Sequence, residues 1–195
     1  MEQKRRTALF FGSFNPIHVG HLVIASTMRQ QEGVDEVWLV VSPQNPLKER
    51  STLLADHHRL AMVRRAIEDD YKLQVCDIEM HLPRPSYTVV TLAALEEKYP
   101  GREFSLIMGG DSLATLHRWR NHEYILEHYP IYVYPRPGYR RNPYEGNPNV
   151  KVVDVPMMDI SSSYIRRRIS EGGDVRYLLT EPVYRYLTEM HFYEN

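Results

Sequence analysis

The sequence has little that would mark a secreted, membrane or nucleic-acid-binding protein. Its one cysteine, Cys76, excludes an internal disulfide and a cysteine-rich zinc site, and suits a reducing cytoplasm. No apolar run approaches the roughly 20 residues of a membrane-spanning helix, and the charged residues 1–6 precede an apolar run too short for a signal peptide. A net charge of −1 argues against broad electrostatic binding to nucleic acid or acidic membranes. We therefore expect a cytoplasmic protein with neither partner.

What the chain does have is a regular alternation of apolar runs and helix-period segments. The apolar runs predict strands at 7–11, 34–42, 72–80, 103–109, from 131 onward and 151–156. The helix-period segments lie at 19–31, about 55–69, around 92–99, from 110 through about 128, about 162–171 and 181–192. This alternation predicts an α/β fold, a Rossmann-like doubly wound parallel sheet flanked by helices. We expect one domain over 1–195, with a small C-terminal helical part at about 161–195.

Polar and glycine-rich segments follow the predicted strands. In a doubly wound sheet, ligands bind beyond the carboxyl ends of the strands. The segments at those ends are 12–21, 43–50, 81–88, 109–119 and 156–166. We therefore expect the functional residues to lie in these five segments.

The first of these segments reads GSFNPIHVGHL. Gly12 permits a tight turn and close approach of a ligand to the backbone. Pro16 presets the turn, so that His18 and His21 lie on one side of a helix start, where backbone N–H groups and the helix dipole favour an anion. A zinc site would need a third ligand, and plain packing would satisfy both imidazoles with backbone carbonyls. We favour an anion site over both alternatives.

The segment DISSSYIRRRI begins another predicted helix with three serines, Ser161, Ser162 and Ser163, that can cap it. No Glu or Gln occupies the reciprocal capping-box position, which leaves N–H groups available. An arginine run is usually a solvated helix face. Serine hydroxyls, free amides and Arg166 at one helix start also describe a phosphate-binding site.

Gly109 and Asp111 follow the fourth predicted strand. Asp111 either caps the next helix or binds a sugar hydroxyl, two readings that the residues alone leave equal. Trp119 belongs to the core or offers a flat face to an aromatic ring.

Two further segments carry weaker signals. Thr88 is a plausible cap, and its neighbour Tyr87 faces a cleft or packs. Lys48 could meet a phosphate, although a surface lysine is the ordinary reading. Cys76, in a strand-like run, is best read as a small buried hydrophobe.

Two motifs together resemble those of the nucleotidyltransferase superfamily. His-Val-Gly-His at 18–21 matches its His-x-Gly-His motif, and Ser-Ser-Ser-Tyr-Ile-Arg at 161–166 matches its Ser-Ser-Thr/Ser-x-Ile-Arg motif. Within the superfamily the chain resembles the nicotinate-nucleotide adenylyltransferases. That resemblance rests on Ser-Tyr-Thr at 86–88, on Gly109-x-Asp111 with Trp119, and on Arg-Pro-Gly at 136–138, and it runs from about residue 7 to 187.

The resemblance implies transfer of the adenylyl group of ATP to nicotinate mononucleotide, giving deamido-NAD and pyrophosphate. It implies Mg²⁺ bound with ATP, no metal site made by the protein's own residues, small-molecule partners only, and an open choice between monomer and homo-oligomer. The catalytic residues it implies are His18, His21 and Arg166. The ATP-binding residues it implies are Gly12, Ser13, Phe14, His18, His21, Gly109, Asp111, Ile160, Ser162, Ser163 and Arg166. The residues it implies for nicotinate mononucleotide are Asn15, Lys48, Tyr87, Thr88 and Trp119.

Two positions depart from the family pattern. Asn15 stands where an aspartate is usual, and the residues give no function for it. The loop at 45–48 reads Asn-Pro-Leu-Lys where Pro-Pro-His-Lys is common. The alternatives are a relative acting on another acceptor, such as nicotinamide mononucleotide, phosphopantetheine or glycerol phosphate, and an inactive nucleotide-binding regulator. A metal-dependent hydrolase is the least favoured.

Overall fold

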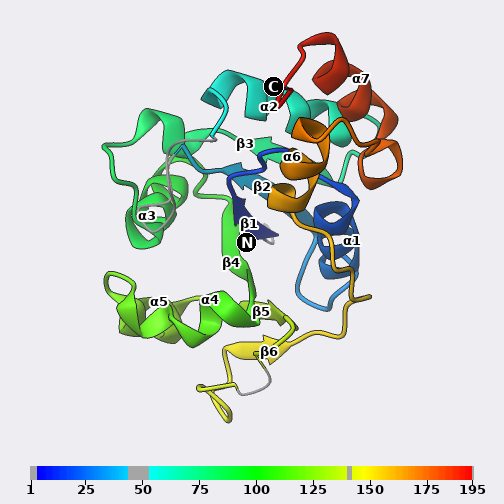
Figure 1. Ribbon diagram of the computed structural model, residues 1–195. Helices are drawn as coiled ribbons and strands as arrows, with labels where there is room; N and C mark the ends of the chain where they lie inside the picture. The colour runs from blue at the N-terminus through cyan, green and yellow to red at the C-terminus, as the bar shows by residue number, and fades with distance from the viewer. Residues whose placement is uncertain (1–3, 44–52, 140–141, 195) are drawn as a thin grey trace.

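The computed structural model describes residues 4–43, 53–139 and 142–194. Those residues form a six-stranded, all-parallel sheet in the order β3-β2-β1-β4-β5-β6 (Figure 1). The strands are β1 (Arg5–Gly12), β2 (Glu36–Val41), β3 (Leu73–Cys76), β4 (Arg102–Gly109), β5 (Ile131–Tyr134) and β6 (Val150–Val152). The predicted doubly wound α/β fold is confirmed, and its order reverses between β1 and β4.

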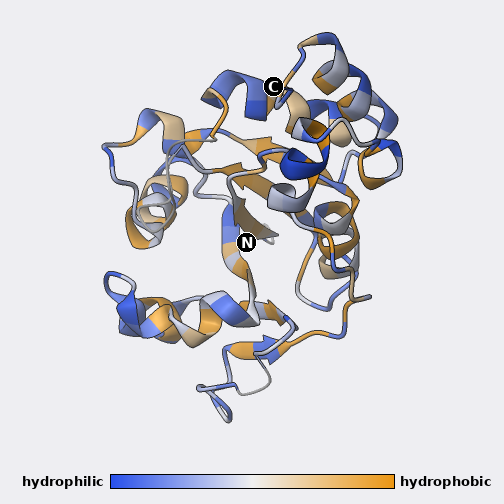
Figure 2. Ribbon diagram, viewed as in Figure 1, coloured by the Kyte–Doolittle hydropathy of each residue, from blue (hydrophilic) through white to orange (hydrophobic). Residues whose placement is uncertain are grey.

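Helices cover both faces of this sheet because its strands are apolar on both sides. Figure 2 shows the central strands as largely hydrophobic. In β1, Ala8 and Phe10 belong to one core and Leu9 to the other, as the two-residue period of a strand requires. The helices are α1 (Val19–Met28), α2 (Asp56–Ala66), α3 (Thr88–Lys98), α4 (Gly110–Ala114), α5 (His122–His128), α6 (Ser162–Ser170) and α7 (Glu181–Glu189).

The two cores divide the helices between them. The first core includes Met28 of α1, Val63 of α2, Ile165 of α6 and Val183 of α7. The second includes apolar residues of α3, α4 and α5. Short 3₁₀ helices lie at Ile78–His81, Leu116–Arg118 and Arg176–Leu178. Within the described ranges, no helix combines the length and apolar character that crossing a membrane requires.

Several predicted boundaries were wrong. The third strand ends at Cys76, because buried Glu79 turns toward α3 and accepts hydrogen bonds from Thr91 Oγ1 at 2.7 Å and Ser86 Oγ at 3.2 Å. The long helix expected after β4 is three short ones, and Asn121 precedes the last of them with a left-handed φ of 53°.

The other boundary errors are shorter. The last strand covers Val150–Val152 rather than 151–156, and no strand or helix is assigned between 153 and 161. The predicted helices at 19–31, 55–69 and 181–192 each end earlier, at Met28, Ala66 and Glu189.

A buried arginine joins the segments that follow β1 and β2. Arg59 of α2 is fully buried, and its Nη1 donates to the carbonyl oxygens of Ser13 and Ser42, both at 2.7 Å. Its Nε donates to the Leu54 carbonyl oxygen at 3.0 Å, and its Nη2 pairs with Asp56 Oδ1 at 2.5 Å. One guanidinium therefore holds two loops at the carboxyl edge of the sheet against the start of α2.

Replacement of this arginine should be strongly destabilising. We expect Arg59→Leu to lower the free energy of unfolding by about 3–5 kcal/mol, because it leaves several loop carbonyl oxygens without their donor and removes one of the two arginine partners of Asp56. Arg64→Leu, on the same helix at a side chain that is 63% exposed, should change it by less than about 0.5 kcal/mol. Urea unfolding of both variants measures the difference. Equal losses would contradict the role given to Arg59.

Candidate functional site

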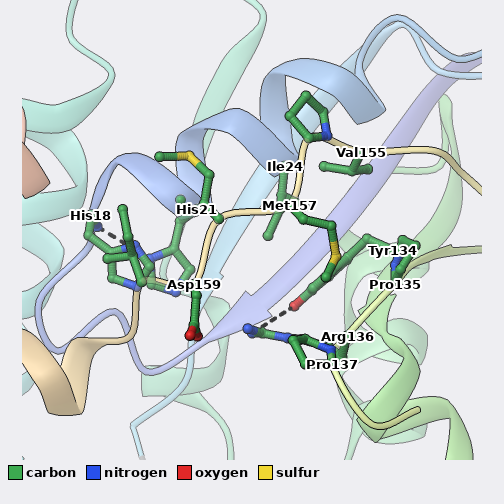
Figure 3. A pocket seen from close by; sticks show the side chains of 14 residues that line it. His18, His21, Ile24, Tyr134, Pro135, Arg136, Pro137, Val155, Met157 and Asp159 are labelled. Carbon is green, nitrogen blue, oxygen red and sulfur yellow. Dashed lines mark hydrogen bonds between the residues drawn. The ribbon is translucent and has the colours of Figure 1, made fainter. Parts of the chain in front are cut away.

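A cavity lies at the carboxyl edge of the sheet, beside the point where the strand order reverses. It is lined by the start of α1, by residues 134–137 after β5, and by the segment 155–160 that leads to α6 (Figure 3). Ligands of doubly wound sheets bind at such a reversal. Of the residues predicted for the site, His18, His21 and Ile160 line this cavity directly.

The two histidines lie against each other. His18 is the N-cap residue of α1, and its backbone N–H donates to His21 Nδ1 at 3.2 Å. Their ring centroids are 3.8 Å apart. Because His21 Nδ1 accepts a hydrogen bond, the proton of its neutral ring resides on Nε2, which is then a donor.

His18 carries no positive charge near neutral pH. Its side chain is buried, and this burial, together with the nearby positive charge of Arg136, lowers the pKa of His18 to about 4. Its Nδ1 is buried and has no hydrogen-bond partner among the residues placed by the structure. The imidazole can therefore donate one N–H hydrogen bond, while positive charge for an anion must come from other residues.

Gly20 and Gly12 leave space for the rings of His18 and Phe14. A Cβ on Gly20 would lie 3.1 Å from both Cε1 and Nδ1 of His18, so the glycine between the histidines admits the first imidazole. A Cβ on Gly12 would lie 2.7 Å from Phe14 Cζ. The place of a Cβ at Gly12 is thus filled by the Phe14 ring, and the approach of a ligand to the Gly12 backbone stays a prediction. Because the Phe14 side chain is in the core, a contact of this residue with ATP would be through its backbone.

The second motif contacts the first directly. Ser162 Oγ donates to the Pro16 carbonyl oxygen at 2.9 Å, and Arg166 Nη1 donates to the Asn15 carbonyl oxygen at 2.8 Å. Arg166 Nη2 also donates to Ser163 Oγ at 3.2 Å. The start of α6 and the β1–α1 loop are therefore in direct contact. A single phosphate site made from both motifs would require this contact.

The structure decides the capping predictions made for Ser161 and Asp111. Ser161 Oγ accepts a hydrogen bond from the Tyr164 N–H at 3.1 Å, so the predicted cap of α6 is confirmed. The N-cap of α4 is Gly109, so the capping alternative for Asp111 is wrong. The Asp111 side chain is 46% exposed, with Oδ1 3.9 Å from Arg136 Nε. Its carboxylate is therefore accessible to a ligand.

Arg136 is the site residue that motif reasoning missed, apart from its place in the Arg-Pro-Gly signature. It follows β5 and lines the cavity, where its Nη2 donates to the Tyr134 hydroxyl oxygen at 3.4 Å (Figure 3). Its Nε is buried and makes no hydrogen bond with any residue in the described parts of the chain. This guanidinium supplies positive charge in the cavity beside the neutral His18.

Two of the residues predicted for the second substrate, Tyr87 and Thr88, lie at the start of α3. Tyr87 is its N-cap residue, without a side-chain cap, and Thr88 is its first residue. The Arg120 guanidinium lies 5.2 Å from the centroid of the Tyr87 ring, which brings the neighbour of Trp119 to this helix start. Trp119 is half-buried against the second core, which agrees with its reading as a core residue, and its stacking on an aromatic ring stays a prediction. Lys48 lies outside the described residues.

Asn15 receives a structural explanation that the sequence did not supply. It is buried, and its Oδ1 accepts hydrogen bonds from the Leu54 N–H at 3.2 Å and the Tyr193 hydroxyl at 2.6 Å. Its side chain therefore holds the β1–α1 loop against two distant segments.

Neither a thiol nor a metal cluster adds chemistry to the part of the chain that is described. Cys76 is buried, which raises the pKa of its thiol to about 11 and keeps it protonated, as expected for a packing residue. No group of three or more His, Cys, Asp or Glu side chains in the described ranges could hold a metal ion.

Comparisons with known proteins agree with this geometry. The cytidylyltransferase-like family matches residues 9–168. A probable nicotinate-nucleotide adenylyltransferase of Flavobacterium johnsoniae is 51% identical, over 97% of this chain and all of that protein. One of Bacteroides fragilis is 46% identical, over 93% of this chain and 90% of that protein. Nicotinic acid mononucleotide adenylyltransferase of Plasmodium falciparum, solved in complex with NaAD, shares the fold with a TM-score of 0.82 at 20% identity, covering 97% of both chains.

The low pKa of His18 can be measured directly. We expect its imidazole resonance to titrate near pH 4 rather than near the ordinary value of about 6.5. Because the unfolded chain binds this proton more readily, the stability that His18 contributes is full above about pH 6.5 and is lost as the pH falls toward 4. Histidine-labelled NMR, with His18→Gln to assign the resonance, tests this. A midpoint near 6.5 would contradict the buried, neutral state.

Proposed function

We propose that this chain, which belongs to the cytidylyltransferase-like family and within it to the nicotinate-nucleotide adenylyltransferases, transfers the adenylyl group of ATP to nicotinate mononucleotide in NAD biosynthesis. The observation that carries the proposal is the contact between the His-x-Gly-His loop and the start of α6, made by Ser162 and Arg166. It supports a single phosphate site built from the two motifs. ATP and nicotinate mononucleotide are its proposed partners, and the cytoplasm is its proposed location.

The proposed reaction needs no nucleophile from the protein. A phosphate oxygen of nicotinate mononucleotide attacks the α-phosphorus of ATP, and a P–O bond forms as the bond to the pyrophosphate oxygen breaks. Deamido-NAD and pyrophosphate are the products. Because the substrate is the nucleophile, the protein has to align the two phosphates and stabilise the charge of the transition state.

The histidines and arginines divide this work. We propose that His18 acts as a neutral N–H donor to ATP phosphate oxygens, since it is unprotonated near neutral pH, and that His21 also donates to them. Arg166 and Arg136 supply the positive charge. Donors that are already fixed in place stabilise developing charge without reorganising during the reaction.

The start of α6 and the β1–α1 loop are proposed to hold the triphosphate. Ser162 uses its hydroxyl proton on the Pro16 carbonyl oxygen, so its backbone N–H and that of Ser163 are the groups offered to phosphate. The backbone of residues 13 and 14 is proposed to approach the triphosphate from the other side. Both belong to the loops joined by Arg166.

The adenosine is proposed to occupy the cavity beside the histidines. Ile160 and Met157 give it an apolar wall, and Tyr134 lines it as well. At the end of β4, Gly109 and the exposed carboxylate of Asp111 are placed to accept hydrogen bonds from the ribose hydroxyls.

The nicotinate end is proposed to lie at the start of α3. Trp119 would stack on the pyridine ring, while Tyr87, Thr88 and the free N–H groups of this helix start would receive the carboxylate. Lys48 remains proposed for the phosphate of this substrate. Asn15, whose side chain is engaged within the protein, would act on this substrate by shaping the loop rather than through its amide.

Mg²⁺ is proposed to enter as part of the Mg²⁺–ATP substrate. The described residues include no cluster of carboxylates or imidazoles able to enclose an ion. Mg²⁺ prefers phosphate oxygens and water to a cage of protein ligands, so the phosphate oxygens of ATP are its proposed ligands. When bound, the ion neutralises charge on the phosphate oxygens.

The acceptor can be identified by pyrophosphate release. With ATP, we expect the fastest release with nicotinate mononucleotide, because the N–H groups at the start of α3 favour an anionic carboxylate over a neutral amide. Nicotinamide mononucleotide, phosphopantetheine and glycerol phosphate are the comparison acceptors. Equal rates for the nicotinate and nicotinamide compounds would overturn the acceptor assignment, and ATP binding without release from any of them would indicate an inactive regulator.

Removal of the first histidine should abolish most turnover. We expect His18→Ala to lower kcat by about 100- to 1,000-fold, the usual effect of losing one fixed donor to a charged transition state. His81→Ala, at a side chain that is 72% exposed, should leave kcat unchanged. A folded His18→Ala variant with near-normal kcat would remove His18 from the mechanism.

A further inference from the structure

Asn15 is a junction of four segments of the chain. Its Oδ1 accepts hydrogen bonds from the Leu54 N–H at 3.2 Å and from the Tyr193 hydroxyl at 2.6 Å, and its carbonyl oxygen accepts one from Arg166 at 2.8 Å. The residue is only 3% exposed and lies in the same loop as His18. The C-terminal segment thus reaches the loop proposed to bind ATP phosphates.

The C-terminal segment is itself firmly held. The Phe192 N–H donates to the Leu187 carbonyl oxygen at 3.1 Å. The Phe192 ring lies 4.7 Å from the ring of His58 and 5.9 Å from that of Tyr186, measured between centroids. Both Phe192 and Tyr193 pack against the first core. This anchoring on α2 and α7 fixes the position of the Tyr193 hydroxyl.

The hydroxyl also lies in the field of two guanidinium groups. Arg59 and Arg166 favour ionisation of Tyr193, but burial opposes it more strongly and raises its pKa. Tyr193 therefore remains protonated near neutral pH and is a donor to the amide oxygen of Asn15. Its partner is neutral, so the bond adds no negative charge beside the proposed phosphate site.

We propose that Tyr193 is a positioning residue that acts through Asn15 to fix the β1–α1 loop, so that the C-terminal segment forms part of the support of the ATP phosphate site. The inference rests on the proposed function for its catalytic consequence. Loss of the hydroxyl frees one side of Asn15, and this allows the loop that carries His18 and receives Arg166 to move.

The kinetic test compares two tyrosines of the same C-terminal region. Tyr193→Phe removes only the hydroxyl that reaches Asn15. Tyr186→Phe removes a hydroxyl that is 2.8 Å from His58 Nδ1 and makes no described contact with the loop. We expect Tyr193→Phe to lower kcat/KM for ATP about tenfold, the effect of one ordinary hydrogen bond, and Tyr186→Phe to leave it unchanged. Unchanged kinetics in Tyr193→Phe, or an equal loss in both variants, would overturn the proposal.

A double-mutant cycle tests whether Tyr193 acts through Asn15. In an Asn15→Ala background, Tyr193→Phe should cause no further loss of kcat/KM, because the acceptor of its hydrogen bond is already absent. Losses that multiply in the double variant would show that the tyrosine acts by another route, and would refute the proposed path.

Hydrogen exchange of the backbone separates this inference from the proposed function. In Tyr193→Phe, amides in residues 12–18 should exchange faster than in the wild type, while those of α5 should not change. If the wild type transfers no adenylyl group yet this loop exchanges faster in the variant, the proposed function fails and the positioning role stands. An unchanged exchange rate in residues 12–18 overturns the positioning role.

Discussion

The carboxyl edge of the sheet depends on hydrogen bonds from two guanidinium groups to loop carbonyl oxygens, one fully buried and one partly buried. Arg59 donates to Ser13 and Ser42 from below the loops, and Arg166 donates to Asn15 from the side of α6. Carbonyl oxygens that face inward in irregular loops need donors, and an arginine can satisfy several of them at once from one planar group. Without these donors, each loop would have to expose its backbone to water. The shape of the site is therefore set by two cations that are already engaged with the backbone.

This arrangement explains how a nearly neutral protein can serve a highly charged substrate. His18 is neutral because burial and Arg136 both oppose its protonation. The proposed phosphate site thus combines neutral N–H donors with a small number of fixed guanidinium groups. Such a site gathers positive charge locally, and the net charge of −1 for the whole chain is no obstacle to it.

The sequence predicted the fold because it depends on local patterns, and the pairing of the two motifs followed from the family resemblance. Apolar strands, helix periodicity and capping serines are visible in any single segment. Tertiary relations were not visible. The space at Gly12 is explained by Phe14, and the function of Asn15 by Tyr193, and no spacing rule links such pairs. The predicted helix at about 55–69 did not single out Arg59, because periodicity places a side chain on a face without saying what backbone lies opposite.

The hydrogen bond between Tyr193 and Asn15 joins nearly the last part of the chain to nearly the first. During synthesis on a ribosome, the sheet strands and the His-x-Gly-His loop emerge long before the segment that completes their support. A nascent chain can fold much of its core, yet it lacks this hydrogen bond until Tyr193 has left the ribosome. A chain that ends before Tyr193 would therefore keep the residues of its sheet and lose one of the hydrogen bonds that hold the β1–α1 loop.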